Sequence, residues 1–232
     1  KMAKDEQSVI SFLDKLTHNS KAQAHKELEE LQAIAPKKLE SFDTAFYSEI
    51  LKKAQYDIDE EEYRPYFEQR GVINGMFEFL NRLFGISFKK VDEELWDAKA
   101  FAYDLYVEDK LKARLYLDLE ARESKQGGAW MNNWQSHHVD MRGVEQLASA
   151  FIVCNFPAST NENPSLLRHD DVVTLFHEMG HAIHHMLSGV NENEVSGVNG
   201  VEWDAVEFPS QFLENFAYEP KVLQLFASHY ET

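Results

Sequence analysis

Apolar residues recur at helical spacing through the first third of the chain, from Asp5 to about Gly85, with charged residues between them. The clearest sets are Val9, Phe12, Leu13 and Leu16, followed by Phe42, Ala45, Phe46 and Ile50. This spacing predicts four or five amphipathic helices. Breaks are expected near Pro36, Pro65 and Gly71.

The pattern changes from helical to alternating between residues 101 and 120, which read FAYDLYVEDKLKARLYLDLE. Apolar residues then fall at every second position around Glu108-Asp109-Lys110, which predicts a β-hairpin with one apolar face. Residues 148–156 are a second extended candidate, and the glycine-containing segment 125–130 is expected to be a loop. Together these segments predict a small antiparallel sheet of three strands.

Helical spacing returns in VVTLFHEMGHAIHHML, residues 172–187. On a helical wheel one face collects apolar side chains, and His177 and His181 fall nearly opposite that face. The apolar set is Val172, Leu175, Phe176, Met179, Ile183 and Met186. We expect this helix to be capped by Ser165 or Asp170 and to stop at Gly189.

The segment VEWDAVEFPSQFLENF, residues 201–216, also has an apolar helical face, formed by Val201, Ala205, Phe208, Phe212 and Phe216. The opposite face carries Asp204, Glu207, Gln211 and Glu214. The expected fold class is therefore mainly α with a small antiparallel β-sheet. Three segments are predicted: a helical segment over 1–100, a small sheet with a glycine-rich loop over 101–160, and helices that carry the candidate metal-binding residues over 161–232.

Composition narrows the classes of function. With 44% hydrophobic residues in 232, the chain is long enough to bury a core, and its net charge of -17 argues against nucleic acid and membrane surfaces as partners. The lone Cys154 lies in an apolar run and is expected to be a buried structural thiol. A single cysteine and no apolar signal or spanning segment fit a cytoplasmic protein.

His177-Glu178-Met179-Gly180-His181 matches H-E-x-x-H, in which two imidazoles one helical turn apart can bind the same Zn²⁺. The pattern also arises by chance, and solvated surface histidines are the competing interpretation. Packing in the core is disfavoured, because the histidines lie opposite the apolar face.

A catalytic zinc usually has three protein ligands and one open position, so this helix needs a third ligand. A carboxylate of the segment 201–216 can supply it. Glu207, just before Pro209, is the candidate, but spacing alone cannot choose it over Glu202 or Glu214.

The blocks FHEMGHAIHHML and GVEWDAVEFPSQFLENF, the motifs GGAW and FIVCNF, and the tail ASHYET resemble the thimet oligopeptidase family of zinc peptidases. The resemblance implies a zincin-like catalytic core that binds one Zn²⁺ through His177, His181 and Glu207. It also implies that Glu178 serves the attacking water and that the substrates are short peptides.

The same resemblance implies an acid near the ligands, for which Asp204 is the match and Asp170 and Asp171 are weaker candidates. Family members hold an extended peptide beside a strand, where the loop of Gly127 and Gly128 would shape the adjoining wall. His184 and His185 are not expected to bind the metal, because four positions are already filled.

The expected function is hydrolysis of internal peptide bonds by metal-activated water. Family members are several hundred residues long, and their transition-state donors lie C-terminal to the block that ends at Thr232. The chain by itself is therefore expected to be weakly active or inactive, and to self-associate through apolar faces that lack partners. The alternative is a non-catalytic, zinc-stabilised helical fragment or peptide-binding module. A purely structural zinc site is disfavoured, because such sites usually close with four Cys or His ligands.

Overall fold

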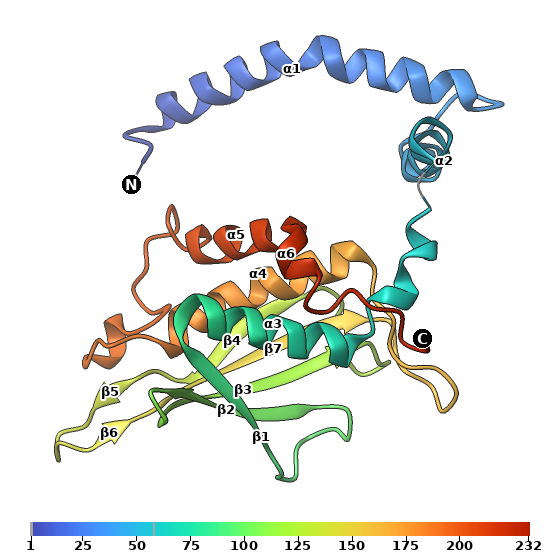
Figure 1. Ribbon diagram of the computed structural model, residues 1–232. Helices are drawn as coiled ribbons and strands as arrows, with labels where there is room; N and C mark the ends of the chain where they lie inside the picture. Colours follow the sequence, from blue (N-terminus) through green and yellow to red (C-terminus); the bar gives the residue numbers. More distant parts are fainter. Residues whose placement is uncertain (1, 58) are drawn as a thin grey trace. The chain divides into compact units, whose positions relative to one another are not determined.

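The computed structural model describes residues 2–57 and 59–232 (Figure 1). The chain divides into two compact units, Lys1–Glu60 and Glu61–Thr232, and each is described by itself. This division falls well before residue 100, where the first predicted segment ends. None of the described helices is long and apolar enough to cross a bilayer.

The first unit contains the helices α1 (Glu6–Ile34) and α2 (Thr44–Tyr56), joined through a short 3₁₀ turn at Ser41–Asp43. Asp5 caps α1 by accepting a hydrogen bond of 2.7 Å from the backbone N–H of Ser8. The predicted apolar faces are present but uncovered among the described residues. Phe12 is 63% exposed and Phe46 is 64% exposed.

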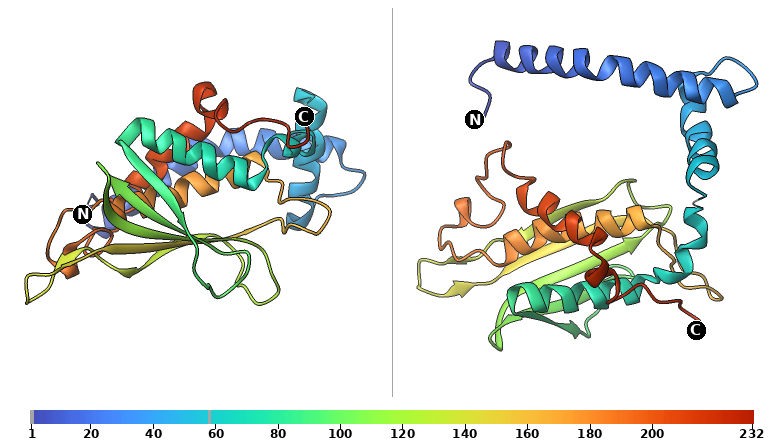
Figure 2. Two further views of the ribbon diagram at one scale, coloured as in Figure 1. Left: turned by 60° about the horizontal axis from the view of Figure 1, so that its bottom comes forward. Right: turned by 45° about the horizontal axis from the view of Figure 1, so that its top comes forward.

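The second unit packs helices on one face of a five-stranded sheet (Figures 1 and 2). Its strands are β1 (Ile86–Val91), β2 (Phe101–Val107), β3 (Lys110–Glu120), β4 (Trp130–Gln135) and β7 (Ala148–Phe156), and β5 (His138–Val139) pairs with β6 (Glu145–Gln146) in a separate ribbon. Its helices are α3 (Gln69–Phe84), α4 (His169–Met186), α5 (Phe208–Glu214) and α6 (Pro220–Leu223). Short 3₁₀ turns lie at Glu60–Glu62, Arg64–Tyr66, Asn193–Val195 and Asn215–Tyr218.

The sheet has the order β1-β2-β3-β7-β4. The predicted hairpin is confirmed as β2 and β3, whose turn uses positive φ at Glu108 and Asp109, and the strand at 148–156 is confirmed as β7. The mainly α class with a small sheet is confirmed, but the sheet is mixed and not antiparallel, because β3 and β7 run parallel. Alternation in a sequence carries no information on strand direction, and the long connection between these strands permits a crossover.

Two strands of the five-stranded sheet, and both strands of the β5–β6 ribbon, were not predicted from the sequence. β1 lies within residues 1–100, which were assigned to helices, and β4 begins at Trp130, at the end of the expected loop. The alternation in β4 is weak because none of its six residues is buried.

The core lies between the sheet and helices α3 and α4. Leu115 and Leu117 of β3 and Ile152 of β7 are fully buried there. The whole apolar set predicted for α4 is buried as well: Val172, Leu175, Phe176, Met179, Ile183 and Met186. The predicted face of this helix is therefore confirmed.

The ends of α4 differ from the expectation. Arg168 is the N-cap residue, and its backbone N–H donates to the carboxylate of Asp171 at 2.8 Å. Ser165 instead donates to the carbonyl of Pro157 at 2.6 Å, and the helix ends at Met186, before Gly189. Asp171, at the third helical position, accepts the hydrogen bond from the N-cap residue, so neither Ser165 nor Asp170 is required to cap the helix.

Two helix boundaries were also predicted wrongly. Gly71 lies inside the first turn of α3, where its N–H donates to Glu68 at 2.7 Å, so it does not break the helix. The helix predicted over 201–216 is shortened to α5, which begins at Phe208. Pro209 lacks an N–H and suits only a first helical turn, so α5 starts at Phe208 and residues 203–207 form turns before it.

Candidate metal centre

The candidate centre consists of two histidines of α4 and one glutamate at the N-terminal end of α5. The Nε2 atoms of His177 and His181 lie 3.3 and 3.1 Å from Oε2 of Glu207. The donor atoms of all three residues lie within 4.8 Å of one another. The side chains of His177 and His181 are 26% and 13% exposed, so both lie outside the packed core.

Gly180 lets α5 approach α4 closely at this point. A Cβ at Gly180 would lie 2.5 Å from the carbonyl oxygen of Pro209 and 2.5 Å from Cα of Ser210. The hydroxyl of Ser210 lies 2.8 Å from both the backbone oxygen and Oε2 of Glu207. The close helix contact and this hydroxyl together orient the Glu207 carboxylate toward the histidines.

The donor set fits a zinc ion. Tetrahedral zinc with ligands at about 2.0–2.1 Å sets neighbouring ligand atoms about 3.3 Å apart, close to the separations between Glu207 and the imidazoles. Burial lowers the pKa of His181, which favours the neutral imidazole that a metal requires. Burial opposes ionisation of Glu207, but Ser210 and the two imidazoles outweigh it, so the pKa of Glu207 is lowered.

Glu214 holds the other nitrogen of His177. Its Oε1 lies 2.5 Å from Nδ1 of His177, which leaves Nε2 directed toward Glu207. A carboxylate on the second nitrogen fixes the ring orientation and tautomer of a ligating histidine. From the sequence, Glu214 was weighed only as a third ligand. The signal for this role was its position seven residues after Glu207, two helical turns along the same face.

The weaker candidates among the acids expected to support the ligands lie at the start of α4, and the role of Asp204 stays a prediction. Asp204 is exposed in the turn before α5, Asp171 takes part in the N-terminal cap of α4, and Asp170 lies in the first turn of that helix. Glu202, an alternative third ligand, is also exposed and lies outside the group of donors.

Glu178 lies beside the donor group and is only 7% exposed. Burial raises the pKa of this carboxyl, while His177 and the backbone N–H of Met131 act in the opposite direction. Met131 belongs to the edge strand β4, and Gly127 and Gly128 precede that strand in the loop. Glu178 is therefore a buried carboxyl beside the donor group and near the edge strand β4.

His184 and His185 lie outside the donor group of the described residues. His185 is fully buried, with Nε2 2.9 Å from the carbonyl oxygen of Gln135 and Nδ1 3.4 Å from the backbone nitrogen of Val198. These contacts attach the loop after α4 and the end of β4 to the helix, which is a structural role.

The family profile described as Peptidase family M3 matches residues 1–232. The chain belongs to this family. Oligopeptidase A of Salmonella typhimurium and oligopeptidase A of Escherichia coli are each 43% identical to it over 239 residues, covering 100% of this chain and 35% of the relative. Dipeptidyl carboxypeptidase of Escherichia coli is 34% identical over 240 residues, covering 100% of this chain and 34% of the relative.

These findings confirm the family resemblance carried by the motifs around His177 and Glu207. The chain spans about a third of the length of these relatives. The relatives are named for action on oligopeptides and for release of dipeptides, so membership of the family does not fix which bond is cleaved.

Proposed function

We propose that this chain carries the zinc-binding and proton-transfer residues of an oligopeptidase that hydrolyses internal bonds of short peptides. The observation that carries the proposal is the group of His177, His181 and Glu207 beside the buried carboxyl of Glu178. In this proposal the chain binds one Zn²⁺, and Glu214 and Ser210 orient two of the ligands.

Bound zinc supplies a Lewis acid that lowers the pKa of a water molecule and polarises the scissile carbonyl. Glu178 accepts the proton of the attacking water and transfers a proton to the leaving amine. Its burial and raised pKa suit this exchange, since a base with a pKa closer to neutrality both takes and returns a proton readily.

The substrate would lie along the free edge of β4. Since β4 has only β7 as a neighbour, an extended peptide can pair with its outer edge, near the carboxyl of Glu178. A Cβ added at Gly127 or Gly128, at the start of this edge, would have no atom within 4 Å, which leaves room for a peptide backbone.

Three further expectations accompany the proposal. The acidic charge of -17 argues against nucleic acid and anionic membranes as partners. The buried, free Cys154 suits a cytoplasmic location. The exposed apolar residues of α5, Phe208 and Phe212, favour self-association of the chain.

Metal binding tests the proposal directly. The chain should bind about one zinc ion, measured by elemental analysis after dialysis, and His177→Ala with His181→Ala should abolish stoichiometric binding. Stoichiometric zinc in the double variant would refute the site. A His138→Ala, His229→Ala variant is the matched control, because neither residue belongs to the donor group.

Turnover separates the peptidase from the non-catalytic alternative. A quenched peptide with blocked termini should be cleaved by an enzyme that contains this region and should be protected by a chelator. We expect the 232-residue chain alone to bind zinc but to cleave this peptide weakly or not at all. Zinc binding without chelator-sensitive cleavage in any longer protein with this region would favour the zinc-stabilised binding module.

A further inference from the structure

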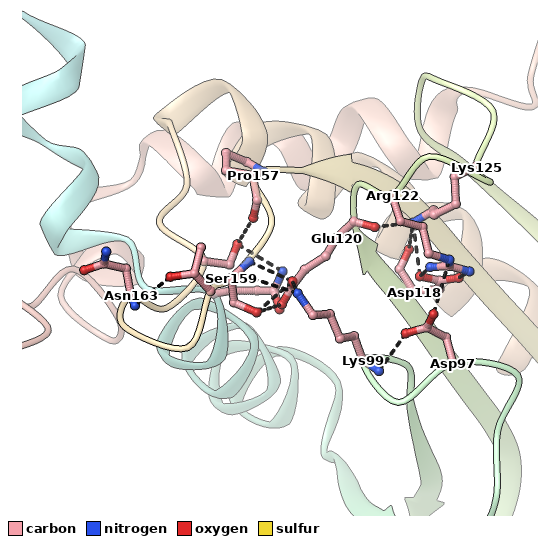
Figure 3. A network of polar contacts seen from close by, with 12 residues as sticks. Asp97, Lys99, Asp118, Glu120, Arg122, Lys125, Pro157, Ser159 and Asn163 are labelled. Atoms are coloured by element: carbon pink, nitrogen blue, oxygen red, sulfur yellow. Dashed lines mark hydrogen bonds and ion pairs between the residues drawn. The ribbon is translucent and has the colours of Figure 1, made fainter.

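Lys125 places an ammonium group in the corner where β3 and β7 end (Figure 3). Its side chain is only 5% exposed. The Nζ atom donates to the backbone oxygens of Asp118 and Glu120 at 2.9 Å each, to the backbone oxygen of Cys154, and to Oδ1 of Asp118 at 3.1 Å. One cation therefore joins the ends of two strands to the start of the loop that precedes β4.

Asp118 is the anion of this corner. Arg122 binds its two carboxylate oxygens at 2.6 and 2.7 Å, and Nε1 of Trp96 donates to it at 2.8 Å. Burial opposes its ionisation, but the hydrogen bonds from Arg122, Trp96 and Lys125 hold the pKa of Asp118 at about 2. Arg122 and Lys125 are thus fixed to β3 by a partner that stays charged at neutral pH.

Asn155 holds the other part of the same loop. Its Nδ2 donates to the backbone oxygens of Gln126 and Gly128, at 2.8 Å each. Gly128 has a φ of +104°, which side-chain-bearing residues rarely adopt, so the carbonyl direction at this point depends on glycine. The loop is consequently attached on both sides immediately before Trp130 enters β4.

The loop leads into the strand that lies beside the proton-transfer group. Met131 is the second residue of β4, aligned with Ile152 of β7. β4 packs against α4, the helix that carries Glu178, and the backbone N–H of Met131 lies near this carboxyl. β4 is an edge strand, so its position depends on one ladder and on its connections. A shift of the loop is transmitted directly to the Met131 N–H and to the free edge beside it.

We propose that Lys125 and Asn155 are positioning residues that fix β4 against Glu178 and so align an extended substrate with the metal centre. This inference rests on the proposed peptidase function. Neither side chain belongs to the donor group, and both act through the loop and β4.

The neighbouring Lys99 supplies a matched control. It belongs to the same polar cluster (Figure 3). Its Nζ lies 2.6 Å from Oε2 of Glu120 and 2.9 Å from the backbone oxygen of Ser159. These two bonds attach it to the end of β3 and to the loop after β7, away from segment 125–128. Lys99→Met therefore removes an ion pair of the same cluster, from a side chain that is 43% exposed, and leaves the attachment of β4 in place.

The test compares Lys125→Met, Asn155→Ala and Lys99→Met in the 232-residue chain. Amide hydrogen exchange over residues 126–135 should accelerate about tenfold or more in the first two variants, since each loses two or more hydrogen bonds of this loop. Exchange in α4 and β2 should stay within about twofold of the unsubstituted chain, and Lys99→Met should leave residues 126–135 unchanged. Asn155→Ala keeps the buried ion cluster intact, so it remains informative if Lys125→Met folds poorly.

A second measurement separates positioning from simple stabilisation. Co²⁺ replaces zinc, and its visible absorption depends on coordination geometry. Lys125→Met and Asn155→Ala should keep one bound Co²⁺ but shift this absorption, because Glu178 lies beside His177 and Glu207 and moves with Met131.

Unchanged exchange over 126–135, an equal effect of Lys99→Met, or faster exchange with an unaltered Co²⁺ spectrum would each overturn the inference. If the unsubstituted chain binds no Co²⁺, the proposed function fails. The exchange comparison then still decides whether Lys125 and Asn155 hold the strand.

Discussion

Replacing Gly180 by alanine should separate the two helices that bring the metal donors together. The added Cβ would lie 2.5 Å from the carbonyl oxygen of Pro209 and from Cα of Ser210, whereas ordinary contacts begin at 3.4 Å. The neighbours are backbone atoms, which cannot rotate away as a flexible side chain would. The N-terminal turn of α5 must therefore move by roughly 0.9 Å, assuming that the helices separate along the contact.

This displacement is large compared with what a metal site tolerates. Ligand distances must agree to within about 0.2 Å, so Glu207 would no longer lie at a binding distance while His177 and His181 stay on α4. We expect zinc affinity to fall by about a hundredfold, comparable to the upper range for disturbing the support of a ligand. The overpacked contact should also reduce the free energy of unfolding by about 1–3 kcal/mol.

Zinc affinity is measured by competition with a chromophoric chelator, and stability by urea unfolding of the metal-free chain. Gly189→Ala is the matched control, because a Cβ there has no atom within 4 Å. A folded Gly180→Ala chain that binds zinc within about twofold of the unsubstituted chain would refute the argument that this close approach positions Glu207.

Three further predictions concern the same region. In an enzyme containing this chain, Glu178→Gln should keep zinc but lose nearly all hydrolysis, because an amide cannot accept the proton of water; normal turnover would contradict the assignment. Glu214→Gln should weaken zinc binding about tenfold to a hundredfold by loosening His177, whereas Glu202→Gln should leave the affinity unchanged, because Glu202 is exposed and outside the donor group. Equal effects in a chelator competition would argue against the distinction. Burial lowers the pKa of His185 in the folded chain, so this imidazole is protonated at a higher pH in the unfolded chain. The free energy of unfolding should therefore decrease as the pH falls below about 6.5. Urea unfolding at several pH values should show a weaker decrease in His185→Gln, and an identical slope would exclude His185 as a cause.

Features that depend on local periodicity could be predicted from the amino-acid sequence alone. The apolar face of α4, the positions of His177 and His181 outside the core, and the β2–β3 hairpin all follow from spacings of about 3.6 or 2 residues, which the backbone geometry imposes. The resemblance of the two motif blocks predicted the family, and the family profile confirmed it. These properties are readable because each depends on residues close together in the chain.

Tertiary structure decided which distant residues meet. Spacing could not choose among Glu202, Glu207 and Glu214, because that choice depends on where Pro209 starts α5 and on how closely Gly180 lets that helix approach. The sequence also could not predict the parallel pairing of β3 with β7 or the edge position of β4. The spacing of apolar residues does not depend on the direction of a strand or on which strand lies next to it. The contact of Met131 with Glu178 and the role of Lys125 depend on that pairing, because hydrogen bonds between residues far apart in sequence form only after the sheet has brought them together.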